Sequence, residues 1–256
     1  MSNNIDSILK LINQTIVDSY SIKLWVPSLI AHEIESISFK PLNISQQKDL
    51  LSTAVVQDLY NTNFTKAAYS ILKENYLSND ILPLHNLNIL DKMVILLSLR
   101  SNINPVYNKT NINDIIKDIQ NSDFSVFSSQ ILELDNIKLY CSLPTIHTEF
   151  LCESEREYID TEDINEQIQH VVSETVINEL TKFCFTAVIG EETIIFDNFT
   201  FSERKQILNK LPAFLLEKAL NYIISCRKQL ETYLTLNKTE ETSNILQING
   251  VFFSTV

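Results

Sequence analysis

The chain has 256 residues, 45% of them hydrophobic, which is enough for a sizeable core and typical of a globular protein rather than a disordered one. Its formal net charge is −12, so its surface repels phosphate backbones and a nucleic-acid-binding role is disfavoured. Glycine occurs only as Gly190 and Gly250. This scarcity excludes the clustered glycines of a phosphate-binding loop or a dinucleotide fingerprint.

Hydrophobic spacing predicts amphipathic helices mixed with short strands along the whole chain. The expected helices cover residues 5–17, 45–60, 65–76, 89–100, 112–120, 165–185, 200–211 and 213–233. The expected strands cover residues 21–26, 34–40, 136–143, 185–189 and 193–196. We expect a mobile polar tail over 238–244. Residues 245–256 are expected to form either a hairpin around Asn249-Gly250 or a strand donated to a neighbouring subunit.

Several predicted helices carry recognisable end signals. Asn88 is expected to cap the helix over 89–100. Asp91 then lies in its first turn and Arg100 in its last, where each charge suits the helix dipole. The cap of the helix over 45–60 is either Asn43 or Ser45.

Two predicted helices differ in their expected surroundings. Residues 93–99 are apolar nearly all round, which predicts a place at the centre of the core. The helix over 165–185 has an apolar stripe on one side only, which predicts an amphipathic helix packed along that side. The stripe consists of Ile168, Val171, Val172, Val176, Leu180 and Phe183.

These elements together predict an α+β fold with mixed helices and small antiparallel sheets. Residues 27–33 and 144–150 each follow an apolar strand and lead through an acidic stretch to a helix, so two loosely similar strand–turn–helix halves are one interpretation. The predicted parts are an N-terminal amphipathic helix, two α+β regions, and a polar tail with a terminal strand or hairpin. Their bounds are 1–18, 19–135, 136–235 and 236–256.

No catalytic, metal or cofactor motif stands out. Cys141, His147 and Cys152 lie close in sequence and are ligand types that zinc prefers, but their spacing contains no C-x2-C pair. No nucleophile elbow is present to specify a Cys–His or Ser–His pair. The acidic run 153–166 is interpreted as a solvated loop, or alternatively as a docking surface for a basic partner. We therefore predict no metal, no cofactor, no small-molecule ligand and no enzymatic activity.

Localisation signals are also missing from the sequence as given. The first residues lack a positive n-region and a long apolar h-region, so no secretory signal is expected. No stretch of about 18 uninterrupted apolar residues suggests a membrane span. Four cysteines are too sparse for a disulfide scaffold, and we expect them to be reduced in a cytoplasmic setting.

Two blocks of sequence carry a family resemblance. The first contains Trp25-Val-Pro-Ser-Leu29, Ser38-Phe-Lys-Pro-Leu42 and Gln46-Gln-Lys48, and the second runs from Leu87 through Asp91-Lys92 to an apolar helix closing on Arg100. Weaker signals follow in the C-terminal half. They are Leu143-Pro144, the segment 180–197, and Phe201-Ser-Glu-Arg followed at fixed spacing by Leu208 and Leu211-Pro212. The chain resembles the baseplate hub and hub-assembly proteins of T-even-like, contractile-tailed bacteriophages.

The resemblance implies a subunit or assembly protein of the baseplate hub, working in tail morphogenesis through contacts with other hub or tail proteins. It implies a place in the host cytoplasm during assembly, with retention in the virion tail left open. A chaperone-like factor that never enters the virion is the first alternative, and an enzyme with no recognisable motif is the second. The expected partner interface comprises Trp25, Pro27, Ser28 and Leu29, together with the terminal segments.

Overall fold

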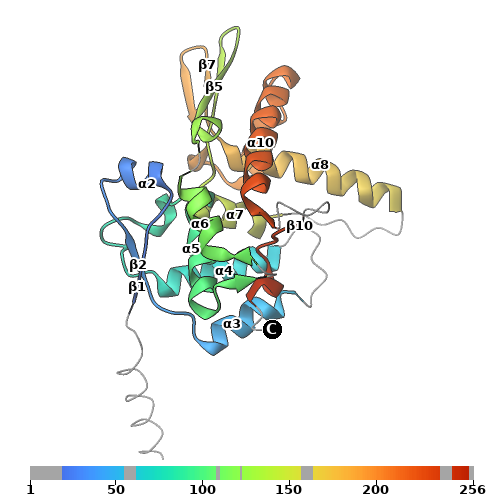
Figure 1. The fold of residues 1–256 in the computed structure, drawn as a ribbon. Helices are drawn as coiled ribbons and strands as arrows, with labels where there is room; N and C mark the ends of the chain where they lie inside the picture. Colours follow the sequence, from blue (N-terminus) through green and yellow to red (C-terminus); the bar gives the residue numbers. More distant parts are fainter. Residues whose placement is uncertain are drawn as a thin grey trace, which may run out of the picture.

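The computed structural model describes residues 19–54, 62–107, 110–121, 123–156, 164–236 and 244–253 (Figure 1). The helix expected over 5–17 lies outside these residues, as does nearly all of the polar tail expected over 238–244.

The described chain is an α+β fold, as predicted, with antiparallel pairing in every sheet. The helices are α2 (Val26–Ala31), α3 (Ile44–Ser52), α4 (Thr62–Asn75), α5 (Ile89–Ile103), α6 (Ile112–Gln120), α7 (Ile146–Ser154), α8 (Ile164–Phe183), α9 (Phe201–Leu208) and α10 (Ala213–Leu234). Short 3-10 turns lie at Leu84–Asn86, Ser125–Phe127, Phe196–Asn198 and Gly250–Phe253.

The described residues also form three two-stranded ribbons and one four-stranded sheet. The ribbons pair β1 (Tyr20–Ile22) with β2 (Ile37–Phe39), β3 (Val106–Tyr107) with β4 (Thr110–Asn111), and β9 (Thr235–Leu236) with β10 (Asn244–Ile245). The four-stranded sheet has the order β5–β6–β7–β8, with strands Gln130–Leu134, Ile137–Cys141, Cys184–Ile189 and Glu192–Ile195. Figure 1 shows a helical body from which the two hairpins of this sheet project beside α10. One continuous hydrophobic core links the two regions.

Helix α5 lies at the centre of the core, as its composition predicts. Its residues 94–97 and Leu99 are almost fully buried. Asn88 caps the helix in a capping box with Asp91, and Asn43 likewise caps α3. On β2, Ile37 and Phe39 share the buried face, because alternate residues of a strand point to the same side.

The first expected strand is wrong in its second half. It ends at Ile22, and Pro27 lies in the first turn of α2 instead of ending a strand. Proline suits that position because a first-turn N–H has no partner within the helix. The segment 144–150 likewise opens α7, so both halves of the predicted repeat begin a helix. They meet at the start of α5, where Ser28 accepts a hydrogen bond from Asn88 Nδ2 at 3.1 Å and Pro144 accepts one from the Ile89 amide at 3.1 Å.

Two further expectations need correction. Strand β5 was not predicted, and the expected boundary between residues 135 and 136 falls in the turn that joins β5 to β6. At the other end, β10 pairs with β9 of the same chain, and Asn249-Gly250 leads into a 3-10 turn instead of a hairpin. Phe252 and Phe253 are fully buried. Within the described residues 244–253, the segment therefore pairs with β9 of its own chain and contributes to its core.

Candidate functional site

The predicted interface around Trp25 is largely buried. Trp25 packs edge-on against Phe124 and Phe127, with ring centroids 6.1 and 5.9 Å apart. Ser28 is buried as well, so neither residue offers a surface to a partner. Pro27 and Leu29 are half-buried. Trp25 and Ser28 must therefore be removed from the interface prediction, because they hold α2 on the core.

Ser28 belongs to a polar node at the start of α5. Its hydroxyl donates to Asp91 Oδ2 at 2.7 Å, and the backbone N–H of Asn88 donates to the same oxygen at 3.1 Å. Burial raises the pKa of Asp91 to about 6, although the hydrogen bonds from Ser28, Asn88 and the Trp25 backbone oppose that rise. The node joins α2 to α5 and has no opening to solvent at Asp91, which is almost fully buried.

Exposed apolar side chains gather instead on the outer face of the four-stranded sheet. The strand register places Ile131, Tyr140, Thr186 and Ile195 in one row across all four strands. Ile131 is 55% exposed and Ile195 is 48% exposed. Leu132, Leu139 and Ala187 point to the opposite, buried face, whereas in the outer row Tyr140 and Thr186 are half-buried and Ile131 and Ile195 are exposed.

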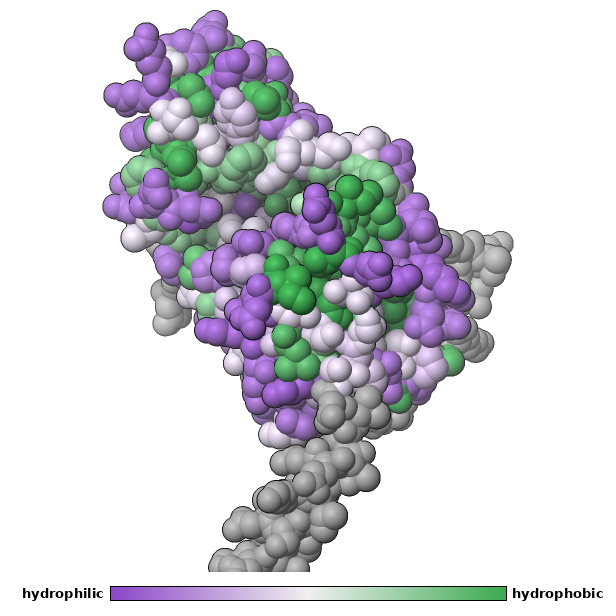
Figure 2. Space-filling model, turned by 90° about the vertical axis from the view of Figure 1, so that its left-hand side faces the viewer, coloured by the Kyte–Doolittle hydropathy of each residue, from purple (hydrophilic) through white to green (hydrophobic). Residues whose placement is uncertain are grey.

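A β-bulge adds an aromatic ring to this face. Tyr140 pairs with Thr186 and Cys141 pairs with Cys184, so Phe185 is the extra residue on β7. A bulge changes the direction of a side chain, and Phe185 is 39% exposed with its ring edge-on to Tyr140 at 6.2 Å. We call Ile131, Tyr140, Phe185 and Ile195 the outer sheet patch. Figure 2 shows apolar side chains among polar ones on the upper part of the molecule, where the hairpins lie.

Helix α8 contributes a second exposed apolar surface. Only the C-terminal end of the predicted stripe is buried, at Leu180 and Phe183. Ile168, Val172 and Val176 follow one another at four-residue spacing on the exposed side of the helix. Figure 1 shows why, since the first half of α8 extends away from the body. The predicted amphipathic face is therefore present, but half of it has no partner within the described chain.

A chain of alternating charges lies where α7, α8 and α10 meet. Arg156 donates to both oxygens of Glu153, at 2.9 and 2.8 Å. Lys182 bridges Glu153 and Glu179, and lies 3.0 Å from Glu179 Oε1. Arg227 completes the chain by donating to Glu179 Oε2. We call these five residues the ion chain.

The ion chain corrects the interpretation of residues 153–166 as a solvated acidic loop at Glu153 alone, since Glu155 and Glu166 are exposed. Glu153 is buried and ion-paired, and residues 157–163 lie outside the described residues. Burial alone pushes the pKa of Glu153 and of Glu179 upward, but Lys182 and the neighbouring arginines lower both below their usual range. Burial opposes the charge on Lys182, and the two glutamates outweigh it and raise its pKa. Glu153, Glu179 and Lys182 therefore stay charged at neutral pH.

A cleft of about 780 Å³ opens beside the ion chain. Lys92, paired with Glu149, lies on another of its walls. The rest of the lining is mainly apolar and comes from α4, α5, α8, α10 and the C-terminal segment. It includes Phe64, Met93, Leu96, Phe183, Leu230 and Ile248. The only signals for this site in the sequence are two acid–base pairs at three-residue spacing, Glu153 with Arg156 and Glu179 with Lys182. Such pairs are too common to identify it.

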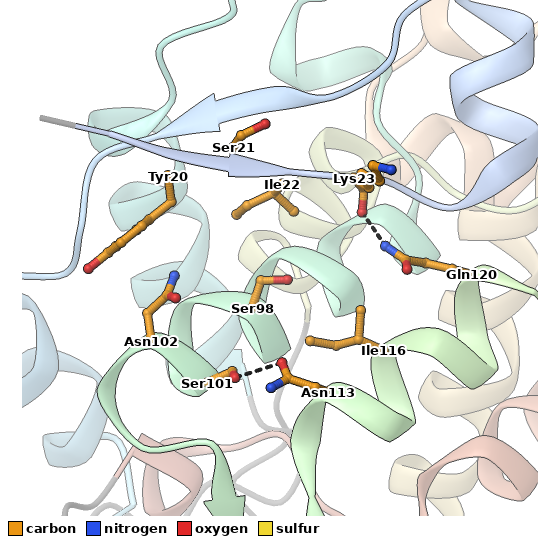
Figure 3. A pocket seen from close by; sticks show the side chains of 10 residues that line it. All are labelled: Tyr20, Ser21, Ile22, Lys23, Ser98, Ser101, Asn102, Asn113, Ile116 and Gln120. Atoms are coloured by element: carbon orange, nitrogen blue, oxygen red, sulfur yellow. Dashed lines mark hydrogen bonds between the residues drawn. The ribbon is translucent and has the colours of Figure 1, made fainter. Parts of the chain in front are cut away.

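A second, smaller pocket of about 330 Å³ lies between β1, α5 and α6 (Figure 3). Its side chains are mostly uncharged amides and hydroxyls that bond to the fold itself. Gln120 donates to the Lys23 carbonyl at 2.6 Å, and Ser101 donates to Asn113 Oδ1 at 2.8 Å. The described residues of the lining include no acid or imidazole that would activate a nucleophile.

The cysteines and His147 have separate partners. Cys141 Sγ lies 3.7 Å from Cys184 Sγ across β6 and β7, and His147 Nδ1 lies 3.0 Å from the Tyr69 hydroxyl. Burial raises the pKa of Cys152 to about 12, which keeps its thiol protonated. Among the described residues, no group of three His, Cys, Asp or Glu side chains is placed to hold a metal ion.

Comparisons with protein-family models, with curated proteins and with solved structures found no match to this chain. Within the described part of the chain, no helix is long and apolar enough to cross a membrane. The likeness to phage baseplate hub proteins therefore stays a prediction from the residues quoted above.

Proposed function

We propose that this protein is a baseplate hub subunit or hub assembly protein of a contractile-tailed phage, acting through contacts with other tail proteins. The observation that carries the proposal is the outer sheet patch. Contiguous exposed apolar side chains are typical of surfaces that a protein partner covers. The exposed stripe of α8 provides a second such surface on a different element.

The sequence resemblance supports other baseplate hub or tail proteins as the partners. The proposal places the protein in the host cytoplasm during tail assembly, either retained in the baseplate or released as a chaperone-like factor. It assigns no catalytic residue. Binding energy comes instead from burying rings and branched side chains against a complementary face, as at the centres of protein interfaces.

The first test is quantitative mass spectrometry of purified virions beside the lysate that produced them. Recovery in particles at a small integer ratio to the hub proteins supports a structural subunit. Presence in the lysate bound to hub components, but absence from particles, supports the assembly factor. Absence of any association with tail components in both samples refutes the proposal.

A matched pair of variants locates the interface. Phe185→Asp places a charge in the outer sheet patch, whereas Phe214→Asp makes the same change at an exposed phenylalanine on α10. We expect Phe185→Asp to remove co-purification with hub proteins and Phe214→Asp to retain it. Equal loss in both folded variants, or no loss in either, would exclude the outer sheet patch as the contact.

A further inference from the structure

The cleft beside the ion chain is lined by none of the residues of the outer sheet patch or of the exposed stripe of α8. Its volume of about 780 Å³ is within the range of roughly 300–1,000 Å³ that small-molecule sites occupy. Its lining also has the composition of such a site, with apolar walls and a few charged groups brought together from separate elements.

The charges of the lining favour an anion. Four cations, Lys92, Arg156, Lys182 and Arg227, face three carboxylates, Glu149, Glu153 and Glu179. The described residues of the lining thus carry one positive charge in excess, in a chain whose formal net charge is −12. Each carboxylate of the ion chain lies between two cations, Glu153 between Arg156 and Lys182 and Glu179 between Lys182 and Arg227. A bound cation would have to compete with those partners.

Arg227 is the cation best placed to meet a ligand. Its side chain is 54% exposed, whereas those of Arg156 and Lys182 are less than a tenth exposed. Arg227 uses Nε and Nη2 on one oxygen of Glu179, and a guanidinium carries five N–H donors. Glu179 fixes the orientation of the group, which lowers the entropy cost of binding a carboxylate or phosphate.

A structural role alone explains the ion chain less well. Buried ion pairs recover little more than their desolvation cost, and apolar side chains of similar volume often stabilise a protein as well or better. Here the buried charges border an open cleft. We propose that this cleft binds a small amphipathic anion, with a carboxylate or phosphate head at Arg227 and an apolar body along Met93, Leu96 and Leu230. This proposal differs from the sequence-based expectation that the protein has no small-molecule ligand.

The test uses decanoate as the probe, measured by isothermal titration calorimetry on the full chain. We expect saturable binding to one site, and no comparable binding of decyltrimethylammonium, which has the same tail and the opposite charge. Arg227→Gln should weaken decanoate binding by about tenfold, because it removes a charged donor. The control Lys228→Gln removes a charge from the next residue of α10, which does not line the cleft, and should bind as the unmodified protein does.

A second variant tests the apolar part of the cleft. Thr175 is an exposed lining residue of α8, and Thr175→Trp should block binding while circular dichroism shows a folded chain. The proposal is overturned if decanoate does not saturate one site, if the cationic probe binds equally well, or if the folded variants bind as the unmodified protein does. None of these measurements involves tail assembly, so their failure would leave the proposed function untouched.

Discussion

Lys182 is the residue on which the ion chain depends most directly. It lies between Glu153 and Glu179 and is itself 8% exposed at its side chain. We predict that Lys182→Met destabilises the protein strongly at neutral pH. Methionine retains an apolar stem of similar length but removes the charge shared by the two carboxylates.

The magnitude follows from what remains after the substitution. Removing one partner from a buried ion pair costs about 3–5 kcal/mol, because the other charge stays buried without compensation. Glu153 keeps Arg156 and Glu179 keeps Arg227, so we expect the lower end of that range. With an m-value of about 3 kcal/mol/M, a loss of about 3 kcal/mol lowers the urea midpoint by about 1 M.

The effect should also depend on pH. Carboxylates whose folded pKa is lowered contribute stability above their unfolded pKa of about 4.3, and that stability is lost as pH falls. Without Lys182 the pKa values of Glu153 and Glu179 rise. The variant therefore loses less stability than the unmodified protein as the pH falls. The deficit measured at pH 7 should therefore shrink at pH 4.

The assay is urea denaturation followed by circular dichroism at both pH values. Lys228→Met, at an exposed lysine of α10, is the matched control and should change the midpoint little. A deficit below about 1 kcal/mol, the usual worth of an exposed ion pair, would refute this account of Lys182. A deficit of the same size at pH 4 and pH 7 would also refute it.

Three further predictions concern the core, the node and a turn. Phe253→Ala should lower the free energy of unfolding, measured with urea, by about 3–5 kcal/mol, because its fully buried ring packs beside Phe64. A negligible change would contradict the packing of the C-terminal segment. Burial raises the pKa of Asp91 to about 6, so its stability contribution is fully present below pH ~4 and declines by about 3 kcal/mol as pH rises through 6. Stability of the unmodified protein relative to Asp91→Asn should therefore fall between pH 4 and 7, and a constant difference would contradict burial of the charge. Gly190→Ala should lower the thermal midpoint by an amount equivalent to about 1–2 kcal/mol. A Cβ has room at this position, but φ is +63°, a conformation that is strained for alanine. An unchanged midpoint would argue against that backbone conformation.

Local signals in the chain predicted much of the fold. Asn88 and Asp91 mark the start of α5, and the helix over 112–120 begins and ends where its apolar spacing does. The errors occurred where the local pattern was ambiguous. Val26 and Pro27 are compatible with the end of a strand or the start of a helix, and contact of α2 with α5 decides for the helix.

The candidate surfaces show the same division. The stripe on α8 is visible in the sequence, but periodicity indicates only that one side is apolar, not whether a neighbour covers it. The outer sheet patch depends on the register of four strands and on a bulge at Phe185, which bring together residues from 131 to 195. The sequence pattern does not predict strand β5, so this surface could not be predicted from the sequence.

Composition, helix ends and hydrophobic spacing by themselves determined the α+β class, the central place of α5 and the expectation of a protein without a recognisable catalytic motif. These features arise between residues a few positions apart, where the chain's own geometry sets the distances. Only the tertiary structure decided that Trp25 and Ser28 are buried, that Phe252 and Phe253 complete the core, and that seven charged side chains line a cleft. Those outcomes depend on contacts between distant segments, whose pairing is set by the packing of the whole chain.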